Sequence, residues 1–95
     1  MSDKQIIEIL TKGGNFFDIK HDSGTKYRCN FHKDGTISTM KFDDGNFEVK
    51  DGNIKFSFNN GFLGLTGTMN AEGNSMEGVY KSKMNAEGTW TAKLF

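Results

Sequence analysis

Two histidines and one cysteine are the residues of this chain whose types best suit metal binding or nucleophilic catalysis. His21 directly precedes a predicted turn, and His32 lies at the far end of the next predicted strand. Strand residues rise about 3.3 Å each, so the two imidazole rings are expected roughly 20 Å apart. Tetrahedral zinc needs all its ligands at about 2 Å. We therefore predict no metal site, and two histidines that are solvated or hydrogen-bonded locally.

The lone cysteine, Cys29, lies in the middle of a predicted strand. Its expected neighbours are Phe17 and Thr39, and neither carries a charge that would stabilise a thiolate. We predict a buried, unreactive thiol that forms no internal disulfide. The predicted hairpins bring together no serine, histidine and carboxylate, so we predict no catalytic residues and no enzyme activity.

Two glycine-containing segments resemble ion-binding loops in composition alone. In Asp43-Asp44-Gly45-Asn46 the glycine comes third, whereas a calcium-binding EF-hand loop needs it in the sixth position and lies between helices. Segment 61–67 is followed by a strand, whereas a phosphate-binding loop leads into the N-terminus of a helix. We interpret both segments as turn and strand structure and predict no cofactor.

A short helix is predicted at the N-terminus, over residues 2–12. Ser2 and Gln5 have the spacing of a capping box, in which each side chain bonds a free backbone N–H group of the first turn. Ile6 and Leu10 fall on one face at helical spacing. So short a helix is marginal by itself, so its apolar face is expected to pack on the rest of the chain.

From Asn15 onward the hydrophobic period changes to two, which indicates β-strands. Seven glycine-containing turns divide residues 15–94 into eight strands. We predict these strands at 15–21, 25–32, 36–42, 46–50, 53–58, 63–69, 75–83 and 88–94.

The turns also predict how neighbouring strands pair. Asp22-Ser23-Gly24 suits a three-residue hairpin loop, which places Ile19 opposite Tyr27. The same reasoning places large apolar residues opposite one another in later hairpins: Val49 and Ile54, Phe56 and Leu65, Leu65 and Tyr80, Met69 and Met76. A shift by one residue would move every one of these side chains to the wrong face.

The predicted strand 36–42 breaks this alternation. Ile37 should face the interior, but Met40 and Phe42 have the opposite parity. We predict a β-bulge near Ser38–Met40, which would reconcile the two parities and bend the sheet sharply.

These elements predict a mainly β protein with a single domain over residues 1–95. Eight sequential antiparallel strands make an up-and-down meander, and an open meander would leave two unpaired edges. Closure into a small barrel removes both edges, so we predict a closed barrel with the helix packed on it or capping one mouth. The alternative is an open meander curled over the helix.

The pentapeptide Met-Asn-Ala-Glu-Gly occurs twice, at Met69–Gly73 and Met84–Gly88. Each copy lies between two strand-like runs and is predicted to form a turn. Successive hairpin turns lie at opposite ends of a sheet, so the two copies are expected at opposite rims and not in one site. We interpret the repeat as one hairpin turn used twice.

The C-terminal strands carry glycines inside the strands and a Gly-Thr-Trp at the start of the last one. The segments concerned are Leu65-Thr66-Gly67-Thr68, Met76-Glu77-Gly78-Val79-Tyr80 and Gly88-Thr89-Trp90-Thr91-Ala92-Lys93. This pattern of glycines and tryptophan in successive hairpins resembles that of small lipocalin-like and avidin-like barrels of the calycin type. The resemblance implies a barrel whose interior or mouth takes a small, largely apolar ligand.

Aromatic side chains dominate the predicted inner face: Phe17, Tyr27, Phe31, Phe47, Phe56, Phe58, Tyr80 and Trp90. An eight-stranded barrel has an interior that side chains can just fill, or that holds one small ligand. The simpler interpretation is a filled core. If a ligand is held, we expect it among five of these residues, namely Tyr27, Phe31, Phe56, Tyr80 and Trp90, because buried hydroxyl and indole N–H groups need partners.

Charge limits the classes of partner. The chain has 12 Lys and Arg against 12 Asp and Glu, and the two halves are each balanced. Nucleic-acid binding demands a basic excess, so we predict no nucleic-acid partner. No apolar run approaches the ~20 residues of a membrane span. We therefore predict no membrane association and a cytoplasmic location.

Two functional hypotheses follow from the sequence. The first is a small cytosolic binding module that holds an apolar or aromatic small molecule in or at the mouth of the barrel. The second is a protein-interaction or inhibitory domain with a solidly packed barrel, which contacts its partner through the helix face or a rim, with Phe62 and Phe95 as contact points. Nothing in the sequence favours one oligomeric state over another.

Overall fold

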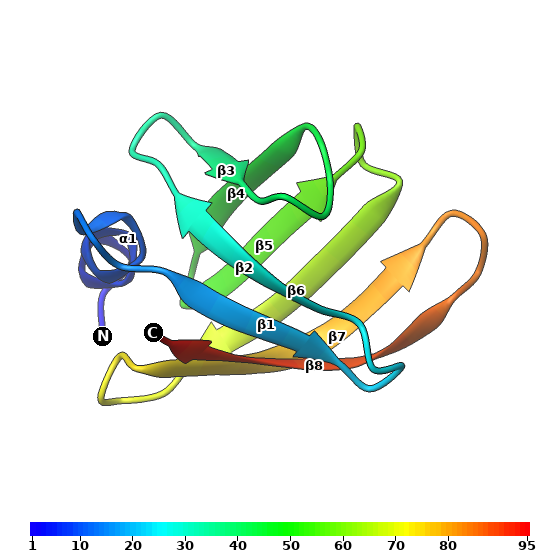
Figure 1. Cartoon of the computed structure of the whole chain (residues 1–95). Helices are drawn as coiled ribbons and strands as arrows, with labels where there is room; N and C mark the ends of the chain where they lie inside the picture. The colour runs from blue at the N-terminus through cyan, green and yellow to red at the C-terminus, as the bar shows by residue number, and fades with distance from the viewer.

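The computed structural model describes residues 1–95 as one helix and eight antiparallel strands that close into a barrel (Figure 1). The elements are α1 (Asp3–Thr11), β1 (Phe17–His21), β2 (Lys26–Phe31), β3 (Thr36–Ser38), β4 (Gly45–Lys50), β5 (Asn53–Phe58), β6 (Leu63–Met69), β7 (Ser75–Ser82) and β8 (Glu87–Leu94). The predicted fold class is confirmed, and the open alternative is wrong because β1 pairs with β8 from Phe17 opposite Leu94 to His21 opposite Trp90. The single helix is too short to span a membrane.

The predicted strand register is also confirmed. Ile19 lies opposite Tyr27 in the first hairpin. The later pairs agree as well: Val49 with Ile54, Phe56 with Leu65, Leu65 with Tyr80 and Met69 with Met76. Turn chemistry and alternation therefore place the large apolar side chains in the interior, as the sequence indicates.

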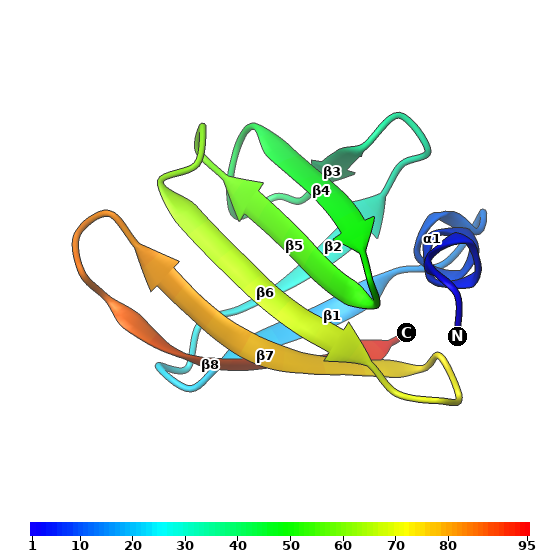
Figure 2. The ribbon, with the colours of Figure 1, turned by 180° about the vertical axis from the view of Figure 1, so that it is seen from behind.

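Helix α1 covers one end of the barrel (Figure 2). The capping box is present, since Gln5 N–H donates to Ser2 Oγ at 3.1 Å and Ser2 N–H donates to Gln5 Oε1 at 2.8 Å. The Asp3 carboxylate accepts from the backbone N–H groups of Asp51 at 2.9 Å and Gly52 at 2.8 Å, which ties the helix to the β4–β5 turn. Leu10 is fully buried against the barrel core. The apolar face of α1 thus closes this end.

The prediction for strand 36–42 is wrong in its second half. β3 ends at Ser38, and residues 39–44 form an irregular connection instead of a bulged strand. Met40 is fully exposed in this loop, whereas Phe42 turns inward and packs against the core. The change of parity therefore arises because the strand ends, and not because one residue is inserted into a continuing ladder.

The two Met-Asn-Ala-Glu-Gly copies form different turns, so their interpretation as one turn used twice is wrong. In the first copy Gly73 has a φ of 75°, and the Asn70 side chain accepts from the N–H groups of Asn74 and Ser75. In the second copy Asn85 has a φ of 63°, and the closing Glu-Gly already belongs to β8. The copies do lie on turns at opposite ends of the barrel, as predicted.

Two facing glycines let the barrel wall come close to its only tryptophan. Gly67 on β6 lies opposite Gly78 on β7. A Cβ atom at Gly67 would lie 2.7 Å from Trp90 Cζ2. The absence of side chains here gives the indole room against the sheet.

Candidate functional site

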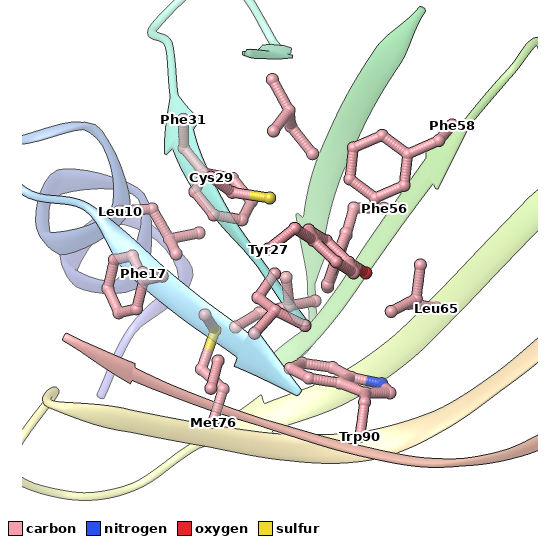
Figure 3. Packing of buried hydrophobic residues seen from close by; sticks show 14 of the residues in the cluster. Leu10, Phe17, Tyr27, Cys29, Phe31, Phe56, Phe58, Leu65, Met76 and Trp90 are labelled. Carbon is pink, nitrogen blue, oxygen red and sulfur yellow. The ribbon is translucent and has the colours of Figure 1, made fainter. Parts of the chain in front are cut away.

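The structure brings the five predicted ligand-binding residues into one aromatic core. Their side chains all point into the barrel and are exposed by 8% (Tyr27), 2% (Phe31), 3% (Phe56), 9% (Tyr80) and 1% (Trp90). Figure 3 shows the labelled members of this core converging from different strands, with Leu10 entering from the helix.

Ring contacts fill the centre of the barrel. The Phe56 ring lies 5.1 Å from that of Trp90 and 5.7 Å from that of Phe31, both in edge-to-face geometry. Phe58 joins this group to Tyr27, with ring centroids 5.9 Å from Phe56 and 5.8 Å from Tyr27. Such aromatic pairs stabilise a core beyond the burial of their area. The interior space is therefore occupied by the protein's own rings.

The Trp90 indole N–H already has partners inside the protein. It donates to the backbone carbonyl of Val79 at 3.1 Å and to that of Thr66 at 3.2 Å. No buried side-chain nitrogen or oxygen in the structure lacks a hydrogen-bond partner. The interior thus offers no unpaired polar group that a ligand is needed to satisfy.

Tyr27 bonds to a buried histidine. Its hydroxyl lies 2.7 Å from His21 Nε2, and the His21 side chain is only 4% exposed. Burial lowers the pKa of His21, with the neighbouring Asp22 carboxylate acting weakly in the opposite direction. Burial also raises the pKa of Tyr27 strongly. Both groups are accordingly held in their neutral forms.

Tyr80 bonds to a carboxylate at the edge of the same cluster. Its hydroxyl donates to Asp22 Oδ1 at 2.9 Å, and its ring stacks on His21 with centroids 4.4 Å apart. The other Asp22 oxygen accepts from Thr89 N–H at 3.2 Å. The Tyr80 hydrogen bond, followed by the Thr89 bond, lowers the pKa of Asp22. A Cβ atom at Gly88 would lie 2.8 Å from Asp22 Cγ, so the glycine provides the space for this contact.

The sequence alone does not predict a place for His21 or Asp22 in this cluster. It predicts that His21 is either solvated or hydrogen-bonded locally, and the structure shows the second, with His21 buried. It predicts only a turn role for Asp22. The sequence does contain a signal that His21 points inward, because Phe17, Ile19 and His21 are every second residue of one strand and so share one face. The stacking on Tyr80 requires knowledge that β1, β8 and β7 are adjacent, which follows only from barrel closure.

The other residues considered for chemistry have structural surroundings. Cys29 is fully buried, and burial raises the pKa of its thiol to about 12. His32 Nε2 lies 2.7 Å from Ser38 Oγ. In segment 43–46, Asp43 and Asp44 end the connection between β3 and β4, and Gly45 begins β4. In segment 61–67, residues 61 and 62 lie in a turn and the rest belong to β6. None of these residues is positioned for nucleophilic attack.

The end of the barrel opposite α1 carries four turns, and three of them are hydrogen-bonded side by side. Asn59 N–H donates to the Asp43 carbonyl at 2.7 Å, which joins loop 39–44 to loop 59–62. Lys83 N–H donates to the Phe62 carbonyl at 2.9 Å, which joins loop 59–62 to loop 83–86. We call these three loops together the open rim (upper right of Figure 1).

Each loop of the open rim exposes one large apolar side chain. Met40 is fully exposed in loop 39–44, Phe62 is 39% exposed in loop 59–62, and Met84 is 76% exposed in loop 83–86. Beneath them, the Phe42 ring lies 5.0 Å from that of Tyr27 and 5.1 Å from that of Phe58. The exposed side chains therefore stand on a rim that is anchored in the aromatic core.

The backbone of the open rim is specified by residues that tolerate left-handed geometry. Four of its non-glycine residues have positive φ: Asp44 at 52°, Asn59 at 55°, Asn60 at 56° and Asn85 at 63°. Asparagine and aspartate adopt this geometry more readily than other side chains. The loops are consequently held in defined turns, and they present Met40, Phe62 and Met84 from a preformed surface.

The buried His21 predicts a pH dependence of stability. Because the pKa of His21 is lowered by folding, the unfolded chain takes up a proton near the ordinary value of 6.5 before the folded protein does. Above pH 6.5 the protein keeps all of the stability that depends on neutral His21. As the pH drops below 6.5, the free energy of unfolding is expected to decrease by up to about 1.4 kcal/mol per pH unit. Urea unfolding followed by circular dichroism between pH 7 and pH 5 measures this slope.

His21→Gln is expected to remove most of this slope, and His32→Gln is expected to retain it. The carboxylates with lowered pKa values, including Asp22, stabilise the fold until the pH falls below the ordinary aspartate value of 3.8. Their protonation therefore does not contribute to the change in stability between pH 7 and pH 5. A wild-type stability that is flat between pH 7 and pH 5 would contradict the assignment to His21.

Comparisons with protein-family models, with curated proteins and with solved structures found no match to this chain. Function is therefore inferred from the barrel itself, its filled aromatic interior and its open rim.

Proposed function

We propose that this chain is a protein-interaction module that binds a partner protein through the open rim. One observation carries the proposal: three hydrogen-bonded loops, all at the end that no helix covers, each expose a large apolar side chain. Clustered exposed apolar residues mark interaction sites more often than scattered ones do.

The chemistry of the rim indicates what kind of partner surface fits. Methionine is flexible and polarisable, so Met40 and Met84 suit an apolar recess of irregular shape. Phe62 supplies a more rigid anchor of the kind that dominates binding energy at interfaces. Lys41 and Asp43 in the same region provide charges of both signs around the apolar centre. The expected partner is therefore an apolar protein surface with a mixed polar border.

The hypothesis of a small ligand inside the barrel has less support. All five candidate side chains are buried in one core cluster, and their polar groups bond within the protein. An apolar molecule could enter only if these rings moved apart. Packing of this density resists such movement, because the rings must separate before a ligand can fill the space between them.

Photo-crosslinking from the rim tests the proposal. A photoreactive amino acid at position 84 is expected to form a crosslink to one partner protein in the source cell. The same group at position 79 is the matched control, because Val79 is 57% exposed but faces outward from the middle of β7. Unlabelled wild-type protein should compete for the crosslink, and a Met40→Ser, Phe62→Ser, Met84→Ser variant should not.

The variant is expected to melt within a few degrees of wild type, because its substituted side chains are exposed. Native mass spectrometry of the purified protein gives the opposing result if the ligand hypothesis holds, namely a stoichiometric small molecule retained by the barrel. Equal crosslinking from positions 84 and 79 would also contradict the rim as the binding surface.

A further inference from the structure

Barrel closure gathers positive charge on the outer face of three strands. β8, β1 and β2 are neighbours, and their outward residues form two rows across the strands: Lys93, Asp18 and Arg28 in one row, and Thr91, Lys20 and Lys26 in the next. These six residues line a shallow depression of about 720 Å³. Four cations against one carboxylate give it a net charge of +3, although the whole chain has a net charge of zero. We call this surface the basic face.

The centre of the basic face contains a like-charge pair. Lys20 and Lys26 are directly opposite each other on β1 and β2, and both are exposed. Directly opposed like charges destabilise an antiparallel pair. Other outward pairs in this barrel combine opposite charges, as Glu48 and Lys55 do on β4 and β5. The opposed lysines thus lower the stability of the free protein, and a bound anion would remove their repulsion.

The remaining charges of the basic face show which cations are free to bind. Arg28 Nε donates to Asp18 Oδ1 at 2.7 Å, and a second Arg28 nitrogen donates to Asp18 Oδ2 at 3.3 Å. The Phe95 ring covers the Arg28 guanidinium, with its centroid 3.7 Å from Cζ. The Arg28 guanidinium is therefore already engaged by the Asp18 carboxylate and the Phe95 ring. The available cations are Lys20, Lys26 and Lys93, which are point charges on flexible stems.

We propose that the basic face binds an extended acidic segment of a partner protein, independently of the open rim. Lys93 on β8 is the diagonal neighbour of Lys20 on β1, a separation of about 7–8 Å. This is close to the distance of about 6.7 Å between alternate side chains of an extended peptide. The central strand β1 is paired with β2 on one side and with β8 on the other, so its backbone N–H groups form no cradle for a single phosphate. Three lysines also fall short of the 6–10 phosphate contacts typical of DNA binding.

Titration calorimetry with a defined peptide tests this proposal. A ten-residue peptide of alternating Glu and Ser is expected to bind wild type in 20 mM salt, to bind weakly in 150 mM salt, and to exceed a Gln-Ser peptide in affinity at both. Lys26→Glu is expected to weaken binding about tenfold or more. The same substitution should raise the melting temperature by about 2–5 °C, because it converts the opposed lysines into an ion pair with Lys20.

Lys55→Glu is the matched control, since it makes the same charge change on β5 but places two carboxylates opposite each other. It is expected to keep peptide binding and to lower the melting temperature slightly. Opposite effects of Lys26→Glu on stability and on binding exclude unfolding as the cause of lost binding. The proposal is overturned if wild type does not bind the Glu-Ser peptide at 20 mM salt, or if Lys26→Glu binds the peptide as tightly as wild type does. It is also overturned if inorganic phosphate or a ten-nucleotide thymidine strand binds more tightly than the peptide.

Discussion

Gly78→Ala should destabilise the barrel by at least about 4 kcal/mol, which for a domain of this size lowers the melting temperature by roughly 20 °C or more. A Cβ atom at position 78 would overlap the Thr66 carbonyl oxygen and lie 2.6 Å from Gly67 Cα. Both contacts are with backbone atoms of β6, so no side-chain rotation relieves them. The β6–β7 ladder would have to separate where Trp90 packs against it. Thermal melts by circular dichroism measure the loss.

Gly64→Ala provides the control on the neighbouring strand β6. The nearest atom to a Cβ there is the Lys81 carbonyl oxygen at 3.9 Å, which is an ordinary contact. Its φ is not in the left-handed region, so alanine is tolerated and is expected to change stability by less than about 1 kcal/mol. If Gly78→Ala melts within a few degrees of Gly64→Ala, the close approach of β6 and β7 is not as described.

Phe56→Ala should cost about 3–5 kcal/mol, the range for removing a buried phenylalanine and leaving a cavity. Phe56 is 3% exposed, and its ring contacts those of Phe31, Phe58 and Trp90. Its removal therefore weakens several aromatic pairs at once. Urea unfolding followed through the fluorescence of Trp90, whose ring lies 5.1 Å away, reports both the stability and the changed surroundings of the indole.

Phe62→Ala makes the same chemical change on the open rim, where the side chain is 39% exposed. It is expected to cost about 1 kcal/mol, well below the cost at Phe56, because over a third of the Phe62 side chain is already exposed in the folded protein. Similar losses for the two variants would mean that the interior is looser than its ring contacts indicate, and would revive the hypothesis of a ligand inside the barrel.

Most of the fold could be predicted because local signals agree with one another. The turn Asp51-Gly52 and the alternation around it define the β4–β5 register without any knowledge of the rest of the chain. The failure at 39–44 has a physical reason. Phe42 packs into the core from an irregular loop, and an inward residue of this kind looks in the sequence like part of a strand.

The repeated pentapeptide shows how tertiary contacts override local sequence. Gly73 in the first copy lies under α1, where an added Cβ would be 2.7 Å from Ile9 Cδ1, and Asn70 bonds the turn backbone. The second copy lies at the other end, where no helix packs on it and Asn85 adopts the positive φ. The same five residues thus form two turns because their surroundings differ.

The members of the aromatic core that lie on strands could be predicted from the alternation alone, since inward positions alternate along each strand. Phe42 could not, because it enters the core from an irregular loop. The polar cluster around His21 and the basic face could not. Both depend on β8 lying beside β1, so that Asp22 meets Tyr80 and Lys93 joins Lys20. Charge counts along the chain are balanced in each half, and only the closed sheet shows that cations from its two ends meet.

The positions of the two chain termini determine how the protein is oriented when it is attached to a support or to a fusion partner. Both ends lie beside α1 in Figure 1, and Phe95 N–H donates to the Phe16 carbonyl at 2.8 Å just after the helix. A tether joined at either end would therefore hold the barrel by its covered base and point the opposite rim away from the support. In a protein immobilised or fused in this way, the exposed side chains of the open rim, Met40, Phe62 and Met84, face away from the point of attachment.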